Sequence, residues 1–347
     1  MCLKMRLFTL LMVLLIPDSP AASVVKKGNK RRAAEAETAG TGRAVLWRNP
    51  ADIASRNLFF GPGGHQHQPH GMFTFLKEDL AGSNPKFTVR DQDGVKWKVK
   101  LGAEARPETV ASRLVWAVGY FTNEDYFLED LRVQDMPGHL HRGQRLVASD
   151  GSMHNVRLKR YLNGEEKIGS WQWRQEPFSG TRELNGLRVM MALINNWDLT
   201  DENTAIYEDE HGGAEGVPEQ IYMVSDLGAS FGKVGLSWPL GKARGNLNAF
   251  RRSKFISRVT PDGVDFRTPA RPAWFFLATP KEYNLRLHLR WIGRQIPRQD
   301  VRWMGQLLAR LSGDQIRDAF RAAGYSTQDV EGFTSVVEER IAELNKL

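Results

Sequence analysis

Apolar and polar residues alternate along residues 72–101, which predicts antiparallel β-strands in the first third of the chain. The segment "DQDG" at 91–94 is typical of a hairpin turn between two of these strands. In the strand that follows the turn, one face carries apolar side chains and the other carries Lys96, Lys98 and Lys100. We therefore expect a hairpin whose second strand has an apolar face and a lysine face.

Apolar residues recur at spacings of three and four in later segments, which predicts helices. A first helix is expected to open at Pro107, because proline is favoured in the first helical turn, and to stop at Gly119. A second covers 182–196, with an apolar stripe formed by Leu184, Leu187, Met191 and Ile194. The carboxy-terminal part is also predicted to be helical, and "SGDQ" at 312–315 has the form of a capping box.

The order of these elements predicts an α+β fold in two parts. Residues 46–180 form a β-rich amino-terminal part that contains one helix, and residues 181–347 form a mainly helical carboxy-terminal part. Within the first part, 120–180 reads as short strands and loops. The segment 231–268 is basic, contains glycine and shows little periodicity, so no element is assigned to it.

The chain begins with the pattern of a secretory signal peptide. Lys4 and Arg6 precede the apolar run Leu7–Ile16, and small residues follow, so we expect cleavage after Ala21. The run is shorter than the roughly 20 residues that span a bilayer, so no transmembrane anchor is expected after cleavage. A wrongly assigned start codon is the alternative. Residues 22–45 are polar and indicate a disordered tether, which makes the expected location periplasmic or extracellular.

The composition narrows the possible chemistry. The single cysteine, Cys2, lies in the leader, so the mature chain has no disulfide, thiolate zinc site or cysteine nucleophile. The net charge of +8 favours anionic partners, but no basic run interleaved with aromatic residues indicates nucleic-acid binding. Ten tryptophans fit a broad aromatic core or carbohydrate contacts. His65, His67 and His70 could bind a metal, but no carboxylate or cysteine accompanies them at ligand spacing.

Five polar residues stand in an order that suits metal-assisted phosphoryl transfer. That chemistry needs a cation at the phosphates with a carboxylate to hold it, oxygen ligands for Mg²⁺, and a carboxylate that orients the attacking hydroxyl. Lys100 ends a strand, and Glu108 lies near the start of the next helix. Asp198 and Asn203 have D-x-x-x-x-N spacing directly after an apolar helix, and Asp226 ends an apolar strand.

Three segments carry a resemblance to the protein-kinase-like superfamily. "KVKLGAEARPE" resembles its lysine strand, "NWDLTDEN" its catalytic loop and "VSDLGASFG" its metal-binding segment. The nearest resemblance is to the atypical branches, namely HipA-type kinases and the secreted FAM-twenty and CotH-type kinases. The resemblance covers roughly residues 72–232 and implies a two-lobed kinase-like fold that uses ATP and Mg²⁺ (or Mn²⁺).

On the phosphate side, the resemblance implies four roles. Lys100 would contact the phosphates and Glu108 would pair with it. Gly82 and Ser83 would lie in the loop that covers the phosphates through its backbone N–H groups. This loop has one glycine where the family has three, and Lys98 shares the face of Lys100, so the sequence leaves the working lysine open. Glu104 is the alternative acidic partner.

On the metal side, Asp198 would act as the general base or hydroxyl-orienting group, while Asn203 and Asp226 would bind the metal. Asp201 is a lesser candidate for substrate contact. Asn and Trp precede Asp198 where the family has His and Arg. Each residue also has an ordinary structural explanation: these side chains could cap loops or fill turns, and the lysines could line a solvated strand face.

Two functions follow from these patterns. The first is an exported kinase-like enzyme that transfers a phosphoryl group from ATP to a hydroxyl of a protein, glycan or lipid, with adenylyl transfer as a variant. A basic segment favours an acidic or phosphorylated substrate, and it contains Lys233, Lys242, Arg244, Arg251, Arg252 and Lys254. The second function is an inactive kinase-fold binding or scaffold protein of the cell envelope, since ATP is scarce outside the cytoplasm. A carbohydrate-binding protein is a third idea, based on the tryptophans alone.

Overall fold

The computed structural model describes residues 42–81, 84–162, 165–174, 177–209, 218–232, 244–268, 277 and 280–347. The predicted signal peptide, residues 22–41 of the predicted tether, and both Gly82 and Ser83 lie outside the described residues. By their contacts, residues Gly42–Leu347 form one compact unit.

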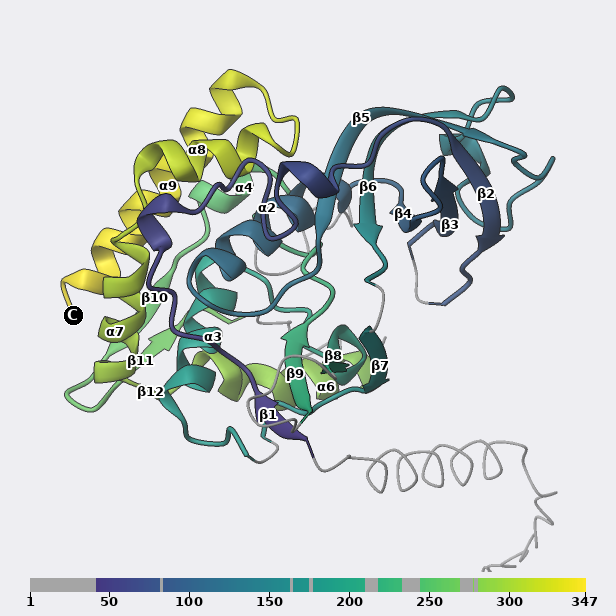
Figure 1. The fold of residues 1–347 in the computed structure, drawn as a ribbon. Coiled ribbons are helices and arrows are strands. Elements are labelled where there is room, and N and C mark those ends of the chain that lie inside the picture. The colour runs from purple at the N-terminus through teal and green to yellow at the C-terminus, as the bar shows by residue number, and fades with distance from the viewer. Residues whose placement is uncertain are drawn as a thin grey trace, which may run out of the picture. The chain divides into compact units, whose positions relative to one another are not determined.

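Five strands close into a barrel in the order β2-β3-β4-β6-β5 (Figure 1). They are β2 (Phe73–Glu78), β3 (Lys86–Asp91), β4 (Lys96–Lys100), β5 (Asp125–Gln134) and β6 (Ser152–Arg160). The predicted hairpin joins β3 to β4, with Phe87 opposite Val99. Trp97 and Val99 are buried in the barrel core while Lys96 is exposed, so the alternation read from the sequence is confirmed.

Strands β5 and β6 are ten and nine residues long, whereas the sequence predicted only short strands and loops there. The pattern was obscured because the fold buries charged side chains in these strands. Asp125 on β5 and Arg157 on β6 are both buried, so they interrupt the apolar alternation without leaving the sheet. β6 pairs with β4 on one edge and with β5 on the other, so its side chains lie next to those of both strands.

Helix α2 (Ala105–Ala117) follows β4 in the chain and packs between the barrel and helix α8. It begins two residues before Pro107, and the chain turns away at Gly119, whose φ of +99° suits glycine. The helix predicted here is therefore confirmed to within two residues at each end. α2 contacts β5 and β6 on one side and α8 on the other, and nearly all of its residues are buried (Figure 1).

A second sheet has the order β1-β9-β8-β7. Its strands are β1 (Arg43–Val45), β9 (Glu219–Val224), β8 (Thr204–Asp209) and β7 (Glu165–Gly169). Residues 43–45 were assigned to the tether, and this assignment is wrong because they pair in parallel with β9. The division into 46–180 and 181–347 stays a prediction, although β7 pairs with the later strand β8.

The remaining described elements are mainly helical and share a large core. They are α3 (Arg182–Leu193), α4 (Leu247–Arg251), β10 (Ile256–Val259), β11 (Gly263–Phe266), α6 (Pro280–Leu289), β12 (Ile296–Pro297), α7 (Arg298–Leu308), α8 (Gly313–Arg321) and α9 (Thr327–Asn345). Every residue from Leu184 to Leu193 is buried, so α3 runs through this core. The capping box predicted at the start of α8 is present, with Ser312 and Gln315 bonded reciprocally.

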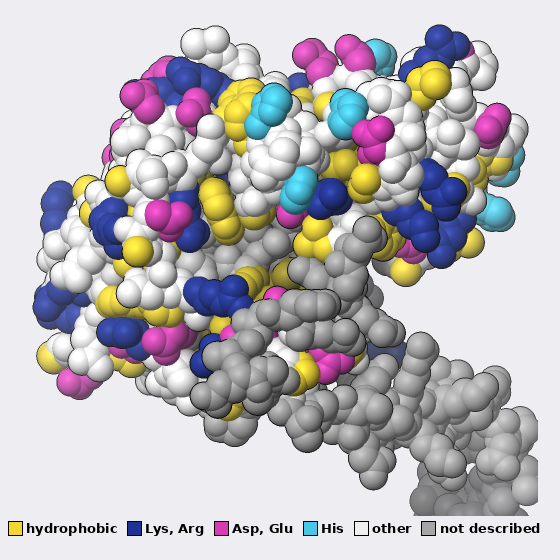
Figure 2. Space-filling view, viewed as in Figure 1, with side chains coloured by type: hydrophobic (Ala, Val, Ile, Leu, Met, Phe, Trp, Pro, Cys, Tyr) yellow, Lys and Arg dark blue, Asp and Glu magenta, His cyan; other side chains and the backbone are white. Residues whose placement is uncertain are grey.

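This architecture confirms the mixed α+β class. Helix α4 and strands β10 and β11 occupy the segment to which the sequence assigned no element, because runs of four or five residues are too short to show a period. In the described part of the chain, no helix combines the length and apolar composition needed to cross a membrane. On the face seen in Figure 2, basic and acidic side chains are interspersed, and a group of adjacent Lys and Arg side chains lies over the barrel.

Candidate active site

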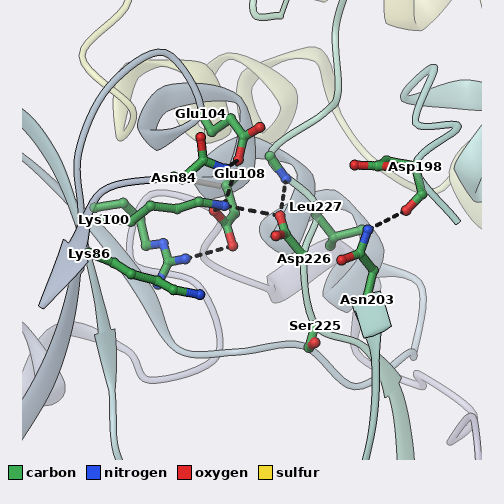
Figure 3. Close-up of polar contacts among 12 residues, drawn as sticks. Asn84, Lys86, Lys100, Glu104, Glu108, Asp198, Asn203, Ser225, Asp226 and Leu227 are labelled. Atoms are coloured by element: carbon green, nitrogen blue, oxygen red, sulfur yellow. Dashed lines mark hydrogen bonds and ion pairs between the residues drawn. The ribbon is translucent and has the colours of Figure 1, made fainter. Parts of the chain in front are cut away.

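The Lys100 side chain lies at the centre of a buried group of carboxylates. Its Nζ lies 2.7 Å from Glu104 Oε2, 2.8 Å from Glu108 Oε2 and 3.0 Å from Asp226 Oδ1. Because only 4% of the Lys100 side chain is exposed, solvent screens these contacts weakly. A barrel strand, a helix and the end of β9 thus meet at one ammonium group (Figure 3), and we call these four residues the Lys100 cluster.

Asp226 is ionised in this cluster. Burial by itself raises the pKa of its carboxyl group, but the Lys100 ammonium and then Arg157 and the Gly228 N–H lower it, and the pKa lies below its ordinary value. Lys100 and Gly228 both bond to Oδ1, and among the described residues no group donates to Oδ2. The side chain is 39% exposed. Asp226 therefore presents a charged oxygen that a ligand can reach.

Arg157 holds Glu108 from the side opposite Lys100, a role that no pattern in the sequence indicated. Its Nη2 donates to Glu108 Oε1 at 2.7 Å, and its Nη1 lies 3.5 Å from Asp125 Oδ1. Burial alone would lower the pKa of Arg157, but the carboxylates of Glu108 and Asp125 raise it above its ordinary value. Arg157 faces Lys100 across the β4–β6 pair, a relationship that only the strand pairing reveals.

Glu104, which the sequence offered only as an alternative to Glu108, also belongs to the cluster. It is the N-cap residue of α2. Its carboxylate accepts a hydrogen bond from Asn84 Nδ2 and forms an ion pair with Arg244. A Cβ atom added at Gly228 would lie 2.7 Å from Glu104 Cβ, so glycine allows the segment after β9 to pack on α2. Arg244, which was expected to face a substrate, instead points to this buried carboxylate.

Asn203 lies beside Asp226 because β8 and β9 are antiparallel neighbours. β8 begins directly after Asn203, and β9 ends two residues before Asp226. The Ser225 N–H donates to the Asn203 carbonyl at 2.9 Å. Figure 3 shows the Asn203 side chain next to Asp226, on the side away from Lys100. The structure thus brings the two predicted metal ligands together at one end of the sheet.

Asp198 lies on the loop between α3 and β8, where hydrogen bonds fix its backbone. Asn203 Nδ2 donates to the Asp198 carbonyl at 2.6 Å, and the Asp198 N–H donates to Asn196 Oδ1 at 3.0 Å. Asn195 has a left-handed φ of 55° as the chain leaves α3, and its Nδ2 donates to the Gly232 carbonyl. Among the described residues no group donates to the Asp198 carboxylate, so this carboxylate is positioned but available.

The geometry favours Lys100 over Lys98 as the lysine of the cluster. Lys98 Nζ pairs with Asp79 Oδ2 at 2.9 Å and lies 5.9 Å from the centre of the Tyr161 ring. Its side chain is 30% exposed, against 4% for Lys100. Lys98 therefore belongs to a separate, more solvated ion pair on the barrel.

Gly82, Ser83 and Asp201 are the remaining sequence candidates for contact with the phosphates or the substrate. Gly82 and Ser83 lie outside the described residues, so their predicted role at the phosphates stays a prediction. Asp201 begins the short 3-10 turn Asp201–Asn203, and its carbonyl accepts a hydrogen bond from Thr204 Oγ1 at 2.8 Å. Asp201 therefore has a structural part in the turn that leads into β8.

The three histidines of the 62–71 segment do not converge on a common ligand position. His67 Nδ1 lies 3.0 Å from Glu124, and His70 Nε2 lies 2.8 Å from Asp93. Among the described residues, no group of three or more His, Cys, Asp or Glu side chains is arranged to hold a metal ion. A site that uses Asn203 and Asp226 alone would not appear as such a group, because it has one amide and one carboxylate.

No protein-family model, no curated protein and no solved structure matches this chain.

Proposed function

We propose that this protein is an exported kinase-like phosphotransferase that moves the γ-phosphoryl group of ATP to a hydroxyl of a protein, glycan or lipid. The observation that carries the proposal is the position of Lys100 between Glu108 and Asp226, at 2.8 and 3.0 Å. Protein kinases need both the ion pair between the strand lysine and the helix glutamate and the metal-binding aspartate to be in place. Here both conditions meet at one buried ammonium group.

The architecture supports a two-lobed kinase-like fold as part of the same proposal. The barrel with α2 precedes the mainly helical part, and the Lys100 cluster joins residues from both. The order of the functional residues along the chain, from Lys100 to Asp226, also follows the order of the kinase elements. The exported location rests on the predicted signal peptide, which lies outside the described residues.

Asp198 is the residue that we assign to the attacking hydroxyl. In the transfer, the hydroxyl oxygen bonds to the γ-phosphorus while the bond from this phosphorus to the β–γ bridging oxygen breaks, and ADP leaves with that oxygen. The Asp198 carboxylate, which accepts no hydrogen bond from the described residues, takes the hydroxyl proton. Lys100 binds the phosphates and lowers the cost of the charge that develops on them.

Asn203 and Asp226 fit the requirements of Mg²⁺ or Mn²⁺. When bound, the ion neutralises phosphate charge and links the nucleotide to the protein. Asp226 Oδ2 receives no hydrogen bond from the described residues, and Asn203 uses its Nδ2 to donate, which leaves the amide oxygen as a ligand. Mg²⁺ sites commonly use one or two protein oxygens and complete the shell with phosphates and waters.

A thermal-shift experiment tests this proposal. We expect ATP with Mg²⁺ to raise the melting temperature of the native protein, and we expect this rise to disappear in Asp226→Ala. Asp318→Ala is the matched control, because it removes an aspartate of similar exposure. Asp318 on α8 is 37% exposed, pairs with Arg321 and is not part of the Lys100 cluster. A rise that is equal in native protein and Asp226→Ala, or absent from both, would contradict the proposal.

Turnover separates an enzyme from an inactive scaffold. An enzyme releases ADP in the native form, and Asp198→Asn should keep the nucleotide-dependent shift but lose ADP release. A nucleotide shift with no ADP release from any form would instead favour the scaffold. Label that passes from γ-labelled ATP to the acceptor indicates phosphoryl transfer. Label that passes to the acceptor from α-labelled ATP indicates adenylyl transfer.

A further inference from the structure

A small polar pocket lies beside β10 and β11, in the segment to which the sequence assigned no element. Its volume is about 160 Å³. Six polar residues line it: Ser257, Asp265, Arg267, Thr268, Arg290 and Arg294. One water needs roughly 10–15 Å³, so the pocket has room for a group as large as a phosphate or sulfate.

The charge of this pocket is positive. Three arginines, Arg267, Arg290 and Arg294, and one acidic residue, Asp265, line it. Asp265 Oδ1 accepts the Gln295 N–H at 2.8 Å. Among the described residues, neither Arg267 nor Arg294 forms an ion pair with a carboxylate. Guanidinium groups bind phosphate and sulfate through paired hydrogen bonds, so these side chains suit a tetrahedral oxyanion.

The wall that carries Arg290 and Arg294 is fixed from the core side by Arg188. This residue is 6% exposed, and its guanidinium group donates to the carbonyls of Trp291, Ile292 and Arg294 at 2.9, 2.8 and 2.6 Å. A buried guanidinium that commits three donors to one short turn holds that turn in a single conformation. Arg188 therefore gives the backbone of this wall a rigid support, while the side chains of Arg267 and Arg294 are exposed and open to a ligand from solvent.

The pocket also lies next to the loop that carries Asp198. A Cβ atom added at Gly293 would lie 2.6 Å from the side chains of both Thr268 and Trp197, so glycine allows both side chains to pack against the backbone here. Trp197 directly precedes Asp198, and its Nε1 donates to Asn195 Oδ1 at 2.8 Å. Thr268, which lines the pocket, and Trp197, which precedes Asp198, thus both pack against Gly293.

We propose that this pocket, formed around Arg267, Arg290 and Arg294, binds a phosphate or sulfate ester carried by the acceptor substrate. The role of the pocket at the acceptor rests on the proposed function. An anionic group held here keeps the acceptor beside Trp197 and directs a neighbouring hydroxyl toward Asp198. It narrows the acceptor to a molecule that already bears a phosphate or sulfate group. The anion-binding step itself needs no nucleotide, so it can be tested separately.

Inorganic sulfate and inorganic phosphate are suitable probes for the full chain. The melting temperature is measured against the concentration of each anion at constant ionic strength, with chloride as the balancing salt. We expect a saturable rise in the native protein and its loss in the double variant Arg267→Gln/Arg294→Gln. Arg258→Gln is the matched control, because Arg258 is an exposed arginine on β10 that does not line the pocket. The control also corrects for the general stabilisation of folded proteins by sulfate.

Further variants make the outcomes distinct. Lys100→Met should melt at a lower temperature than the native protein, but sulfate should raise that temperature by the same increment if the anion binds at the arginine pocket. The double variant should keep the rise caused by ATP with Mg²⁺, which also shows that it is folded. The inference is overturned if the sulfate response is absent from the native protein, is unchanged in the double variant, or depends on Lys100. Loss of the ATP response in the native protein alone counts against the proposed function and leaves the anion pocket standing.

Discussion

Lys100 Nζ lies 3.0 Å from Asp226 Oδ1, although the two residues are 126 positions apart in the sequence. The lysine belongs to a barrel strand and the aspartate to the loop after β9, so this contact joins the two parts of the candidate site. Glu104 and Glu108 complete the environment of the ammonium group. Arg244 and Arg157 each hold one of these glutamates as well, so among the described residues Asp226 is the carboxylate of the cluster that shares Lys100 without an arginine ion pair of its own.

Replacement of Lys100 by methionine should destabilise the protein strongly. The change leaves Glu104, Glu108 and Asp226 close together without their shared cation, and removal of one partner from a buried ion pair costs about 3–5 kcal/mol. Lys98→Met is the matched control on the same strand, and loss of its partly exposed pair with Asp79 should cost about 0–1 kcal/mol. Urea unfolding at neutral pH measures both free energies. Equal losses in the two variants would contradict the burial and pairing of Lys100.

Protonation of Asp226 should contribute to the loss of folding stability at acidic pH. Its pKa in the folded protein lies below the ordinary value of 3.8. Its contribution to stability is therefore present above the unfolded pKa and is lost as the pH falls through the lower folded pKa. The difference in unfolding free energy between native protein and Asp226→Asn should change across this acidic range, and carbon-detected NMR of the Asp226 carboxyl group should give a pKa below 3.8. A pKa at or above 3.8 would be inconsistent with the Lys100 contact.

Replacement of Lys159 by methionine should stabilise the protein at neutral pH. Lys159 lies opposite Lys98 across the β4–β6 pair, and its Nζ donates to the Tyr207 hydroxyl at 3.1 Å. Burial lowers the pKa of Lys159 to about 8, although Asp125, opposite it across the β5–β6 pair, acts to raise it. The folded protein thus carries a poorly solvated charge below this pH, and its removal should add roughly 1–3 kcal/mol.

The sign of the pH dependence provides the check on Lys159. Between about pH 8 and 10.5 the unfolded chain binds more protons at this lysine than the folded protein does, so the stability of the native protein rises with pH. The advantage of Lys159→Met, measured by urea unfolding, should accordingly shrink from neutral to alkaline pH. Lys96→Met, at an exposed position on β4, should show no such trend. A constant advantage for Lys159→Met would show that the ammonium group is not the cause.

Local patterns in the sequence predicted the elements around the site well. The alternation in 72–101 gave the β3–β4 hairpin, the spacing of apolar residues gave α3, and Ser312 with Gln315 gave the start of α8. These features depend on neighbouring residues, so the sequence displays them directly. The order of Lys100 and Asp226 within kinase-like segments likewise singled out residues that the fold brings together.

Long-range pairing accounts for what the sequence did not reveal. Arg157 enters the site because β6 pairs with β4, and Arg244 enters it because the segment after β9 packs on α2. Neither relationship leaves a local periodic signal. The choice between Lys98 and Lys100 likewise depended on burial, since both lysines alternate correctly along one strand.

Metal binding at Asp226 is tested most directly by titration of Mn²⁺ into the full chain in the presence of a non-hydrolysable ATP analogue, with the free ion measured by electron paramagnetic resonance. We expect the native protein and Asp318→Ala to bind Mn²⁺ beyond the amount held by the analogue alone. Asp226→Ala and Asn203→Ala should each bind it at least about tenfold more weakly, which corresponds to about 1.4 kcal/mol. Equal Mn²⁺ affinity in native protein and Asp226→Ala would contradict the claim that Asp226 holds the metal ion at a nucleotide site.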